Sequence, residues 1–313
     1  MDDMSQAKLL EVSHLRIAFR RDGRQVVPVR DVSFSVPEHG RVALVGESGC
    51  GKSLTALSLA GLPPIDRAEV GGSISFTPIE GRSPRLAYVF QNPTESLNPV
   101  MRVRDQIREA LPDGLSRRAG DDRIVELLAR TGLPDPVRAA SSFPCELSGG
   151  QQQRAMIAMA LAAQPDLLVA DEPTTALDVT TQREVLDLMD SLAAETGMAV
   201  LLITHNLGLV AGRMDTVNVM YAGTVVESGP VVEVLADPRH PYTQGLLAAV
   251  PALDAPRDAP LADIPGTVPP PDAWPPGCAF APRCSLATDR CRSEIPAETR
   301  CGARSLACLL RQV

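Results

Sequence analysis

The sequence predicts an α/β fold: a mostly parallel core sheet with an antiparallel β subdomain, a helical insert and a cysteine-rich C-terminal extension. Three continuous apolar runs, RVALV (41–45), LLVAD (167–171) and AVLLIT (199–204), are typical of buried central strands. Helical patterns follow the first two runs, at residues 51–62 and at about 179–195. Strands that alternate with helices favour a parallel sheet.

The antiparallel subdomain and the insert are predicted from the other patterns. Within the strand-like stretch 12–45, VRDVSFSV (29–36) alternates apolar and polar residues, as a half-exposed antiparallel strand does. VNVMYAGTVVES predicts a hairpin around Ala222 and Gly223. The pattern is helical from about residue 92 to 165, which indicates an insert. Further strands are expected at 73–76 and 85–90, and helices near 103–111, 121–131 and 149–164.

Composition and charge narrow the class of protein. The chain has 313 residues, enough for one large domain with an appendage, and a net charge of −8. Nucleic-acid surfaces need clustered Lys and Arg, and base stacking needs aromatic residues, which make up only 3% of this chain. We therefore expect no nucleic-acid partner. Because no signal peptide is recognisable and no apolar run approaches the ~20 residues that span a bilayer, we expect a cytoplasmic protein.

A glycine-rich loop after the first buried strand predicts a nucleotide site. GESGCGKS fits G-x-x-x-x-G-K-S between a strand and a helix, the context that this motif requires. Its glycines let N–H groups turn toward a phosphate, and the helix start adds positive charge. Lys52, one of two lysines, should reach the β- and γ-phosphates, and Ser53 should ligate Mg²⁺. The phosphate loop comprises Gly46, Glu47, Ser48, Gly49, Cys50, Gly51, Lys52 and Ser53.

Polar side chains at other strand ends predict the metal and water sites. The strand in LLVADEP ends in Asp171 and Glu172, whose side chains point in opposite directions, so that one acid can hold the metal and the other can face water. Such a pair alone could equally be a solvated edge or a helix cap, but the phosphate loop favours the catalytic interpretation. Gln91 follows another strand and can ligate Mg²⁺. His205 follows AVLLIT, where it can polarise the γ-phosphate.

A second glycine-containing turn, LSGGQ, opens a helix but has no lysine. Its serine and glycines can offer a hydroxyl group, N–H groups and the helix dipole to a γ-phosphate. An ordinary helix cap is the alternative interpretation. This signature turn comprises Leu147, Ser148, Gly149, Gly150 and Gln151.

The order of these motifs resembles that of the ATP-binding-cassette (ABC) ATPase family over about residues 10–250. Phosphate loop, Gln, LSGGQ, a strand ending in DE, ALD and His follow one another as they do in that family. The resemblance implies a P-loop NTPase of the ABC type that uses ATP and Mg²⁺. It also implies that LSGGQ caps the ATP held by a second subunit in a head-to-tail dimer, so that hydrolysis weakens the contact.

The resemblance further implies a role for each motif residue. Glu172 is the general base, and His205 is the switch histidine at the γ-phosphate. Asp178, in TALD, lies at the dimer seam. Phe19 stacks on adenine, with a core phenylalanine as the alternative interpretation. Mg²⁺ is held by Ser53, Gln91 and Asp171, the last of these through water.

Longer stretches resemble one branch of the family, the ATPase subunits of dipeptide, oligopeptide and nickel importers. They are QNPTESLNP, FPCELSGGQQQR, DEPTTALDVTTQ, ITHNLGLVA, VMYAGTVVESGP and PRHPYTQGLL. Two residues depart from the branch: Cys145 stands where His is usual, and Asn206 stands where Asp is usual. Losing a carboxylate beside His205 can change how its imidazole is oriented. The branch implies import of peptides, with nickel or another small solute as the alternative cargo.

The branch also implies partners and a place in the cell. We expect a peripheral subunit on the cytoplasmic face of the cell membrane that pairs with a second ABC ATPase subunit, either a paralogue or a second copy. Two transmembrane permease subunits bind the pair, and an extracytoplasmic solute-binding protein supplies the cargo. A soluble ABC ATPase acting on nucleic acid is a competing class, against which the single cassette and the acidic balance argue. A metal-cluster sensor is a further competing class of protein.

The C-terminal part differs in character from the rest. The nucleotide-binding domain is expected at 8–250, with its helical subdomain at about 92–165, and the linker and extension at 251–313. Nine prolines between Pro251 and Pro276 predict an extended linker.

Five of the seven cysteines fall in the last 36 residues, in the spacing C-x5-C-x6-C-x9-C-x6-C. These spacings are wider than the short pairs typical of zinc sites, and four thiolates can also hold a [4Fe–4S] cluster. The branch carries four cysteines here and some members bind such a cluster. The resemblance therefore implies a [4Fe–4S] cluster, with zinc and free thiols as alternatives. The implied ligands are Cys278, Cys284, Cys291 and Cys308, and Cys301 is spare.

Overall fold

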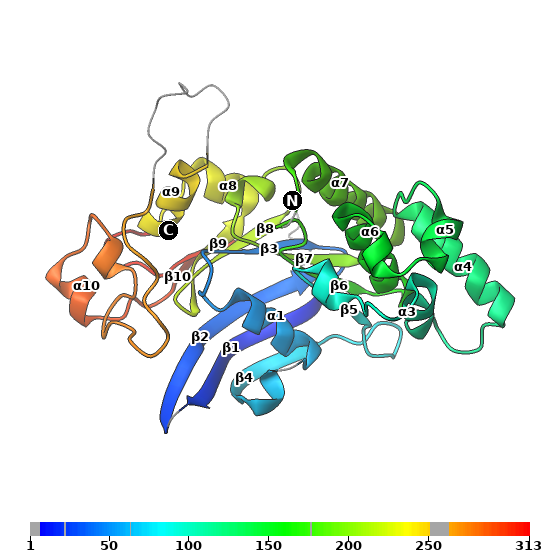
Figure 1. The fold of residues 1–313 in the computed structure, drawn as a ribbon. Helices are drawn as coiled ribbons and strands as arrows, with labels where there is room; N and C mark the ends of the chain where they lie inside the picture. Colours follow the sequence, from blue (N-terminus) through cyan, green and yellow to red (C-terminus); the bar gives the residue numbers. More distant parts are fainter. Residues whose placement is uncertain (1–6, 22, 63, 176, 251–262) are drawn as a thin grey trace. The chain divides into compact units, whose positions relative to one another are not determined.

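The computed structural model describes residues 7–21, 23–62, 64–175, 177–250 and 263–313. The chain divides into two units, which Figure 1 draws as a ribbon. The first unit is Met1–Phe76 with Leu202–Val313, and the second is Thr77–Leu201. Residues 251–262 of the predicted linker lie outside the described residues, and 263–276 contain neither helix nor strand.

The first unit contains the antiparallel β subdomain and the strand before the phosphate loop. Its strand order is β4-β1-β2-β9-β8-β3. β1 is antiparallel to β2 and β4, whereas β8 is parallel to β3 and antiparallel to β9. Burial alternates along the second half of β2, as VRDVSFSV predicted. The bounds are β1 (Lys8–Arg21), β2 (Arg24–Pro37), β3 (Arg41–Val45), β4 (Glu69–Phe76), β8 (Thr216–Tyr221) and β9 (Thr224–Pro230).

The predicted hairpin around Ala222 and Gly223 is confirmed and joins β8 to β9. Both residues have left-handed φ values, 47° and 77°, as a two-residue hairpin turn requires. A Cβ on Gly223 would lie 2.6 Å from the carbonyl oxygen of Pro28, so only glycine fits there. The carbonyl oxygen of Gly223 accepts a hydrogen bond from the N–H of Arg30 at 2.8 Å. The hairpin is thereby fixed against β2.

The strand before the phosphate loop and the helix after it form as predicted. Val42 to Val45 of β3 are buried, which agrees with a continuous apolar strand. Helix α1 (Lys52–Ala60) follows the loop and ends at Gly61, which is left-handed with φ 62°. Two helices near the end of the cassette, α8 (Val231–Ala236) and α9 (Pro241–Ala248), were not predicted.

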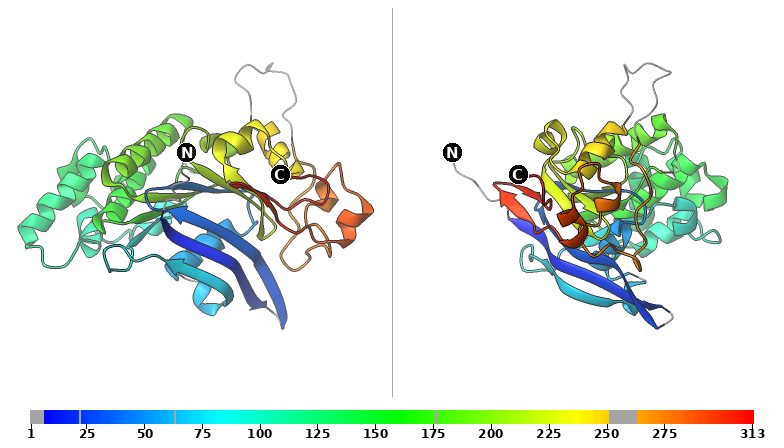
Figure 2. Two further views of the ribbon diagram at one scale, coloured as in Figure 1. Left: turned by 180° about the vertical axis from the view of Figure 1, so that it is seen from behind. Right: turned by 90° about the vertical axis from the view of Figure 1, so that its left-hand side faces the viewer.

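The C-terminal extension, residues 263–313, adds strands to the sheet of the first unit. β11 (Arg304–Leu306) is antiparallel to β9, with Ser305 opposite Ser228. β10 (Thr299–Cys301) pairs with β11 in turn. In Figures 1 and 2 the orange-to-red extension, which includes α10 (Asp289–Ser293), lies beside α9 and β9 in every view. The extension is therefore part of this unit.

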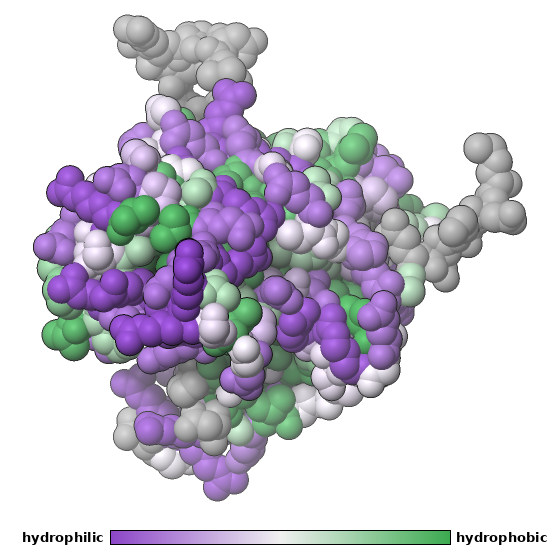
Figure 3. Space-filling model, turned by 90° about the vertical axis from the view of Figure 1, so that its right-hand side faces the viewer, coloured by the Kyte–Doolittle hydropathy of each residue, from purple (hydrophilic) through white to green (hydrophobic). Residues whose placement is uncertain are grey.

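The second unit contains the predicted helical insert and the strand that ends in two acids. β5 is parallel to β6, and every residue of β6 is buried. Apolar residues are scattered among hydrophilic ones on the side that carries α4 and α5 (Figure 3). The bounds are β5 (Leu86–Val89), α2 (Pro93–Ser96), α3 (Val103–Glu109), α4 (Arg117–Arg130), α5 (Pro136–Ser141), α6 (Gly149–Ala162), β6 (Leu167–Asp171) and α7 (Val179–Thr196).

Strand β7 (Ala199–Thr204) carries the chain from the second unit back to the first, and all six of its residues are buried. The predicted strand AVLLIT is confirmed. None of the helices in the described part of the chain combines the length and the apolarity that a bilayer crossing requires.

Candidate functional site

The phosphate loop is held tightly by its own unit. A Cβ on Gly46 would lie 2.2 Å from the carbonyl oxygen of Met220, and one on Gly51 would lie 2.8 Å from that of Pro28. Gly49 and Gly51 have φ values of 82° and 100°, which favour glycine. The three glycines are thus needed for close backbone approach and for the curl of the loop.

Lys52 points back into the loop. Its Nζ donates to the carbonyl oxygens of Gly46 at 2.7 Å and of Glu47 at 3.0 Å, and the side chain is buried. Helix α1 begins immediately after Gly51, which has no side chain to cap the first N–H groups. An anion can satisfy those groups instead, so the helix start and the ammonium group together form a site for a phosphate.

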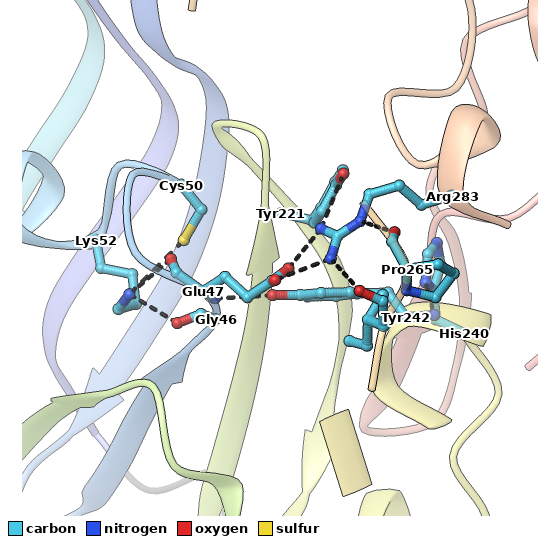
Figure 4. Close-up of polar contacts among 10 residues, drawn as sticks. Gly46, Glu47, Cys50, Lys52, Tyr221, His240, Tyr242, Pro265 and Arg283 are labelled. Atoms are coloured by element: carbon cyan, nitrogen blue, oxygen red, sulfur yellow. Dashed lines mark hydrogen bonds and ion pairs between the residues drawn. The ribbon is translucent and has the colours of Figure 1, made fainter. Parts of the chain in front are cut away.

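Glu47 is held on all its polar groups, as Figure 4 shows for this region. Its N–H donates to the hydroxyl oxygen of Tyr242 at 2.8 Å. Arg283 of the extension donates to both oxygens of its carboxylate, at 2.7 and 2.9 Å. Sequence patterns gave no sign of either contact, because Tyr242 and Arg283 lie 195 and 236 residues away along the chain.

Two further predicted residues, Cys50 and His205, lie in the phosphate loop and next to it. The Cys50 thiol is buried, and burial raises its pKa although nearby Lys52 opposes the shift. The N–H of Gly46 donates to the carbonyl oxygen of Thr204 at 3.3 Å, so His205 emerges beside the loop, where it is exposed. Asn206 accepts a hydrogen bond from the N–H of Gly208 at 2.9 Å and thereby caps the short 3-10 helix Leu207–Leu209.

Phe19, the predicted adenine contact, lies on β1 opposite Val26 of β2 and is half-buried.

In the second unit, Gln91 and Glu172 are brought together. The side-chain amide of Gln91 donates to Glu172 Oε2 at 3.2 Å, and the hydroxyl group of Thr175 donates to the same oxygen at 2.8 Å. Glu172 is buried at 9% exposure and has a φ of 46°. A left-handed glutamate is strained, and strain of this kind gathers at functional sites.

The neighbouring acid has a different environment. Asp171 Oδ2 accepts from the hydroxyl group of Tyr88 at 2.8 Å. Burial raises the pKa of Tyr88, and the Asp171 carboxylate raises it further, so the phenol stays protonated. The two acids thus contact different groups. Thr175 and Tyr88 stand within motifs that the sequence singled out, but nothing marked them as contacts.

The signature turn opens α6 and is capped within itself. Ser148 is the N-cap: its hydroxyl oxygen accepts from the N–H of Gln151 at 3.4 Å, and its own N–H donates to Gln151 Oε1 at 3.0 Å. Ser148 and Gly149 are exposed, and a Cβ on Gly149 would meet nothing within 4 Å. A Cβ on Gly150 would lie 3.1 Å from Thr181 Cγ2. Leu147 is half-buried.

A further contact links two motifs of the second unit. The hydroxyl group of Thr94, just after Gln91, donates to Gln152 on α6 at 3.1 Å.

Asp178 caps α7 and accepts from the N–H and hydroxyl groups of Thr181, which lower the pKa of its carboxyl group. The predicted seam residue is therefore ionised and exposed at neutral pH.

The cysteines of the extension do not form a metal-ligand set. Among the described residues, no three His, Cys, Asp or Glu side chains lie close enough to hold a metal ion, so the predicted cluster on Cys278, Cys284, Cys291 and Cys308 is not supported. The four thiols do share one neighbourhood. Burial raises the pKa of Cys278 and of Cys284, and the nearby thiols of Cys291 and Cys308 raise both further. Cys301 is exposed.

Comparison with known proteins gives consistent matches. Residues 29–175 match the family model of the ABC transporter, and residues 226–291 match that of the oligopeptide/dipeptide transporter C-terminal region. A Brucella ovis protein named for peptide import and ATP binding is 48% identical over 317 residues, covering 94% of each chain. A Brucella abortus protein with the same kind of name is 45% identical, covering 97% of this chain and 96% of its own.

Solved structures with the same fold include ATP-binding cassettes. The cassette MJ0796, a dimer in a post-hydrolysis state bound to ADP and Pi, has a TM-score of 0.60 and 25% identity over 71% of this chain and 98% of its own. CbiO1 of Clostridium perfringens, part of the ABC transporter complex cbiONQ, has a TM-score of 0.62 and 24% identity over 74% of this chain and 92% of its own.

The strand, phosphate loop and helix of the first unit define a nucleotide-binding protein of the P-loop class. The chain belongs to the ABC transporter family, and it is an ATPase of that family.

Proposed function

We propose that this chain is the ATP-hydrolysing subunit of a membrane importer of peptides. Two findings support the cargo class: relatives 45–48% identical over nearly the whole chain are named for peptide import, and residues 226–291 match the C-terminal region of oligopeptide/dipeptide transporters. Nickel or another small solute is the alternative cargo, because cargo is selected by partner proteins.

The residue assignments made from the motifs follow as part of this proposal. Lys52 and the N–H groups of the phosphate loop bind the β- and γ-phosphates, and Phe19 contacts adenine. Ser53, Gln91 and Asp171 would hold Mg²⁺, which neutralises charge on the phosphates. Glu172 takes a proton from the attacking water while the oxygen of that water bonds to the γ-phosphorus. The bond from the γ-phosphorus to the leaving oxygen of ADP then breaks. His205 polarises the γ-phosphate.

The proposed assembly of two subunits rests on one observation, the exposure of the signature turn. Ser148 and Gly149 face outward at the start of a 14-residue helix, where Ser148 and Gln151 cap each other. Such a helix start can bind the γ-phosphate of ATP held by another subunit. We infer that ATP joins two ABC subunits head to tail and that hydrolysis releases them. The second subunit is a paralogue or a second copy.

Substituting Glu172 by Gln tests the proposal. Without the carboxylate, turnover should fall by about 10²–10⁴-fold, whereas ATP binding is retained. Because the γ-phosphate then persists, size-exclusion chromatography with ATP should show a trapped dimer. The matched control is Glu126→Gln on α4, an exposed acid paired with Arg123, which should hydrolyse ATP like the unchanged chain. A Glu172→Gln protein with normal turnover contradicts the assignment of the general base.

The assembly has its own test. If the chain pairs with a copy of itself, the trapped dimer forms from the purified chain alone; if it pairs with a paralogue, the dimer needs co-expressed partner. Detergent extracts should yield two permease subunits bound to the chain at the cytoplasmic face of the membrane. Co-purified nucleic acid in place of permease subunits would favour a soluble ABC ATPase.

We place the boundary between the nucleotide-binding domain and the linker with its extension at residue 251, and the cysteines of the extension give a separate proposal. We infer the [4Fe–4S] cluster from the number of cysteines in this tail alone: Cys278, Cys284, Cys291 and Cys308 would have to draw closer together to bind it, since they form no ligand group in the described structure. Anaerobic purification followed by iron and acid-labile sulfide assays tests it. Zinc in place of iron, or a folded protein with neither metal, contradicts the cluster.

A further inference from the structure

Arg283 connects the C-terminal extension to the phosphate loop. It lies at the end of the 3-10 helix Ala281–Arg283, and only 4% of its side chain is exposed. Its guanidinium group reaches the carboxylate of Glu47, the second residue of the loop, with two hydrogen bonds of 2.7 and 2.9 Å. Paired bonds of this kind use the planar shape of arginine, which lysine cannot match.

The other donors of Arg283 are also used. Nε donates to the carbonyl oxygen of Pro265 at 2.8 Å, and Nη2 donates to that of Ile264 at 3.1 Å. Nη1 lies 3.5 Å from the hydroxyl oxygen of Tyr221, a long contact. The five N–H groups of the guanidinium therefore all have acceptors, and the side chain is fixed in one orientation (Figure 4).

An aromatic cluster holds the same part of the extension in place. The ring of Phe280 lies 5.2 Å from that of Tyr221 and 5.4 Å from that of Tyr242, and Tyr221 and Tyr242 are 4.6 Å apart. Tyr242 accepts the N–H of Glu47. Phe280 thus packs on Tyr242, and Arg283, three residues later in the same segment, binds Glu47 directly.

Glu47 passes this restraint to Lys52. With its N–H bound to Tyr242 and its carboxylate bound to Arg283, Glu47 presents its carbonyl oxygen to Lys52 Nζ at 3.0 Å. The same carbonyl oxygen accepts the N–H of Cys50 at 3.4 Å. A shift of Glu47 therefore moves both the curl of the loop and the ammonium group that is to meet a phosphate.

We propose that Arg283 is a positioning residue for ATP binding: through Glu47, the C-terminal extension holds the phosphate loop in the shape that receives the triphosphate. This proposal rests on the proposed ATPase function. It makes the extension a working part of the nucleotide site, beyond its contacts with the sheet.

The test is a double-substitution cycle on the full 313-residue chain, with ATP affinity measured by titrating a fluorescent ATP analogue well below the melting temperature. Arg283→Met and Glu47→Gln should each weaken affinity by about tenfold, the scale of hydrogen bonds to a charged group. Because both act through one contact, the double variant should be no weaker than either single one. Arg283→Lys should recover only part of the affinity.

The control is Arg300→Met. Arg300 also makes a paired contact with a carboxylate, that of Glu298, but it lies exposed on β10 of the same extension. It should bind ATP like the unchanged chain. A role for Arg283 in docking the extension alone would lower the melting temperature and leave affinity unchanged.

Two results overturn the proposal: an Arg283→Met chain that binds ATP like the control, or losses that multiply in the double variant. If Arg283→Met does not fold, the ATP affinity of the double variant is compared with that of Glu47→Gln, because the double variant leaves no unpaired carboxylate. Equal affinities support the proposal, and a further loss of affinity in the double variant overturns it. Failure of the unchanged chain to bind ATP would instead contradict the proposed function.

Discussion

The phosphate loop and the signature turn have similar sequences but opposite surroundings. Each puts glycines at the start of a helix, α1 or α6. In the phosphate loop, Gly46 and Gly51 press against backbone carbonyl groups and Glu47 is bound from three directions. In the signature turn, Gly149 faces open space, and Ser148 and Gln151 cap each other.

The difference indicates what each turn is for. A loop that keeps its own ligand must be shaped before the ligand arrives, and the first unit shapes it with β2, the β8–β9 hairpin, α9 and the extension. A turn that serves a ligand on another chain must stay accessible, so it is stable by itself and otherwise uncovered. The same substitution should therefore damage folding in one turn and assembly in the other.

The largest effect is expected for Gly46→Ala. The added Cβ would lie 2.2 Å from the carbonyl oxygen of Met220, which is backbone and cannot swing away. We expect a loss of about 3 kcal/mol in unfolding free energy, at the upper end for overpacking. Denaturant unfolding measures it, with Gly149→Ala as the matched control, which should match the unchanged chain. Equal stability of the two variants would remove the basis of the comparison.

The next effect concerns assembly. Gly149→Glu adds a side chain where this chain has open space, so folding and ATP affinity should be unchanged. On the dimer, the carboxylate would face the γ-phosphate of the partner's ATP, and like charges at an interface cost several kcal/mol. In the Glu172→Gln background, ATP-driven association should weaken by roughly tenfold or more, as sedimentation would measure. Unchanged association would mean that the turn does not meet the nucleotide.

Local patterns predicted the elements that lie on either side of these turns. RVALV and LLVAD are buried strands because each is continuously apolar, and the hairpin at Ala222 and Gly223 forms because both residues adopt left-handed backbone. The capped helix start at Ser148 was also readable, since a capping box is a pattern of adjacent residues.

Contacts between distant segments were beyond such patterns. The pairing of Glu47 with Arg283 spans 236 residues, and neither side chain stands in a periodic run that reports the other. The pairing of β11 with β9 is equally hidden, because a strand of three residues is too short to show alternation. The extension therefore looked like an appendage in the sequence, whereas in the structure it supports the phosphate loop.

A smaller effect is expected in the pH dependence of the stability of the first unit, which contains the phosphate loop. His240 is buried beside Phe280, caps α9 by accepting the N–H of Tyr242, and donates its own N–H to Glu227. Burial lowers its pKa from 6.5 to about 4. The unfolded chain therefore takes up a proton below pH 6.5 that the folded chain refuses until about pH 4, so stability falls as pH falls through this window.

Between about pH 7.5 and pH 5.5 the loss should be about 1 kcal/mol. His240→Asn keeps a side-chain acceptor for the cap and cannot titrate, so its melting temperature should fall less over this range. Calorimetry at the two pH values checks this. Parallel pH profiles for the variant and the unchanged chain would assign the acid sensitivity to other groups.

The smallest effect is expected at Asn206, where the branch usually has aspartate. Its side chain caps the turn after His205 by accepting the N–H of Gly208 at 2.9 Å, which a carboxylate can also do. Asn206→Asp should thus change stability by less than about 0.5 kcal/mol, and Asn206→Ala should cost about 1 kcal/mol. Denaturant unfolding compares them, and ATP turnover of Asn206→Asp then isolates the charge. Unchanged turnover means that the cap alone positions His205, whereas a severalfold change means that a carboxylate beside the imidazole acts on it directly.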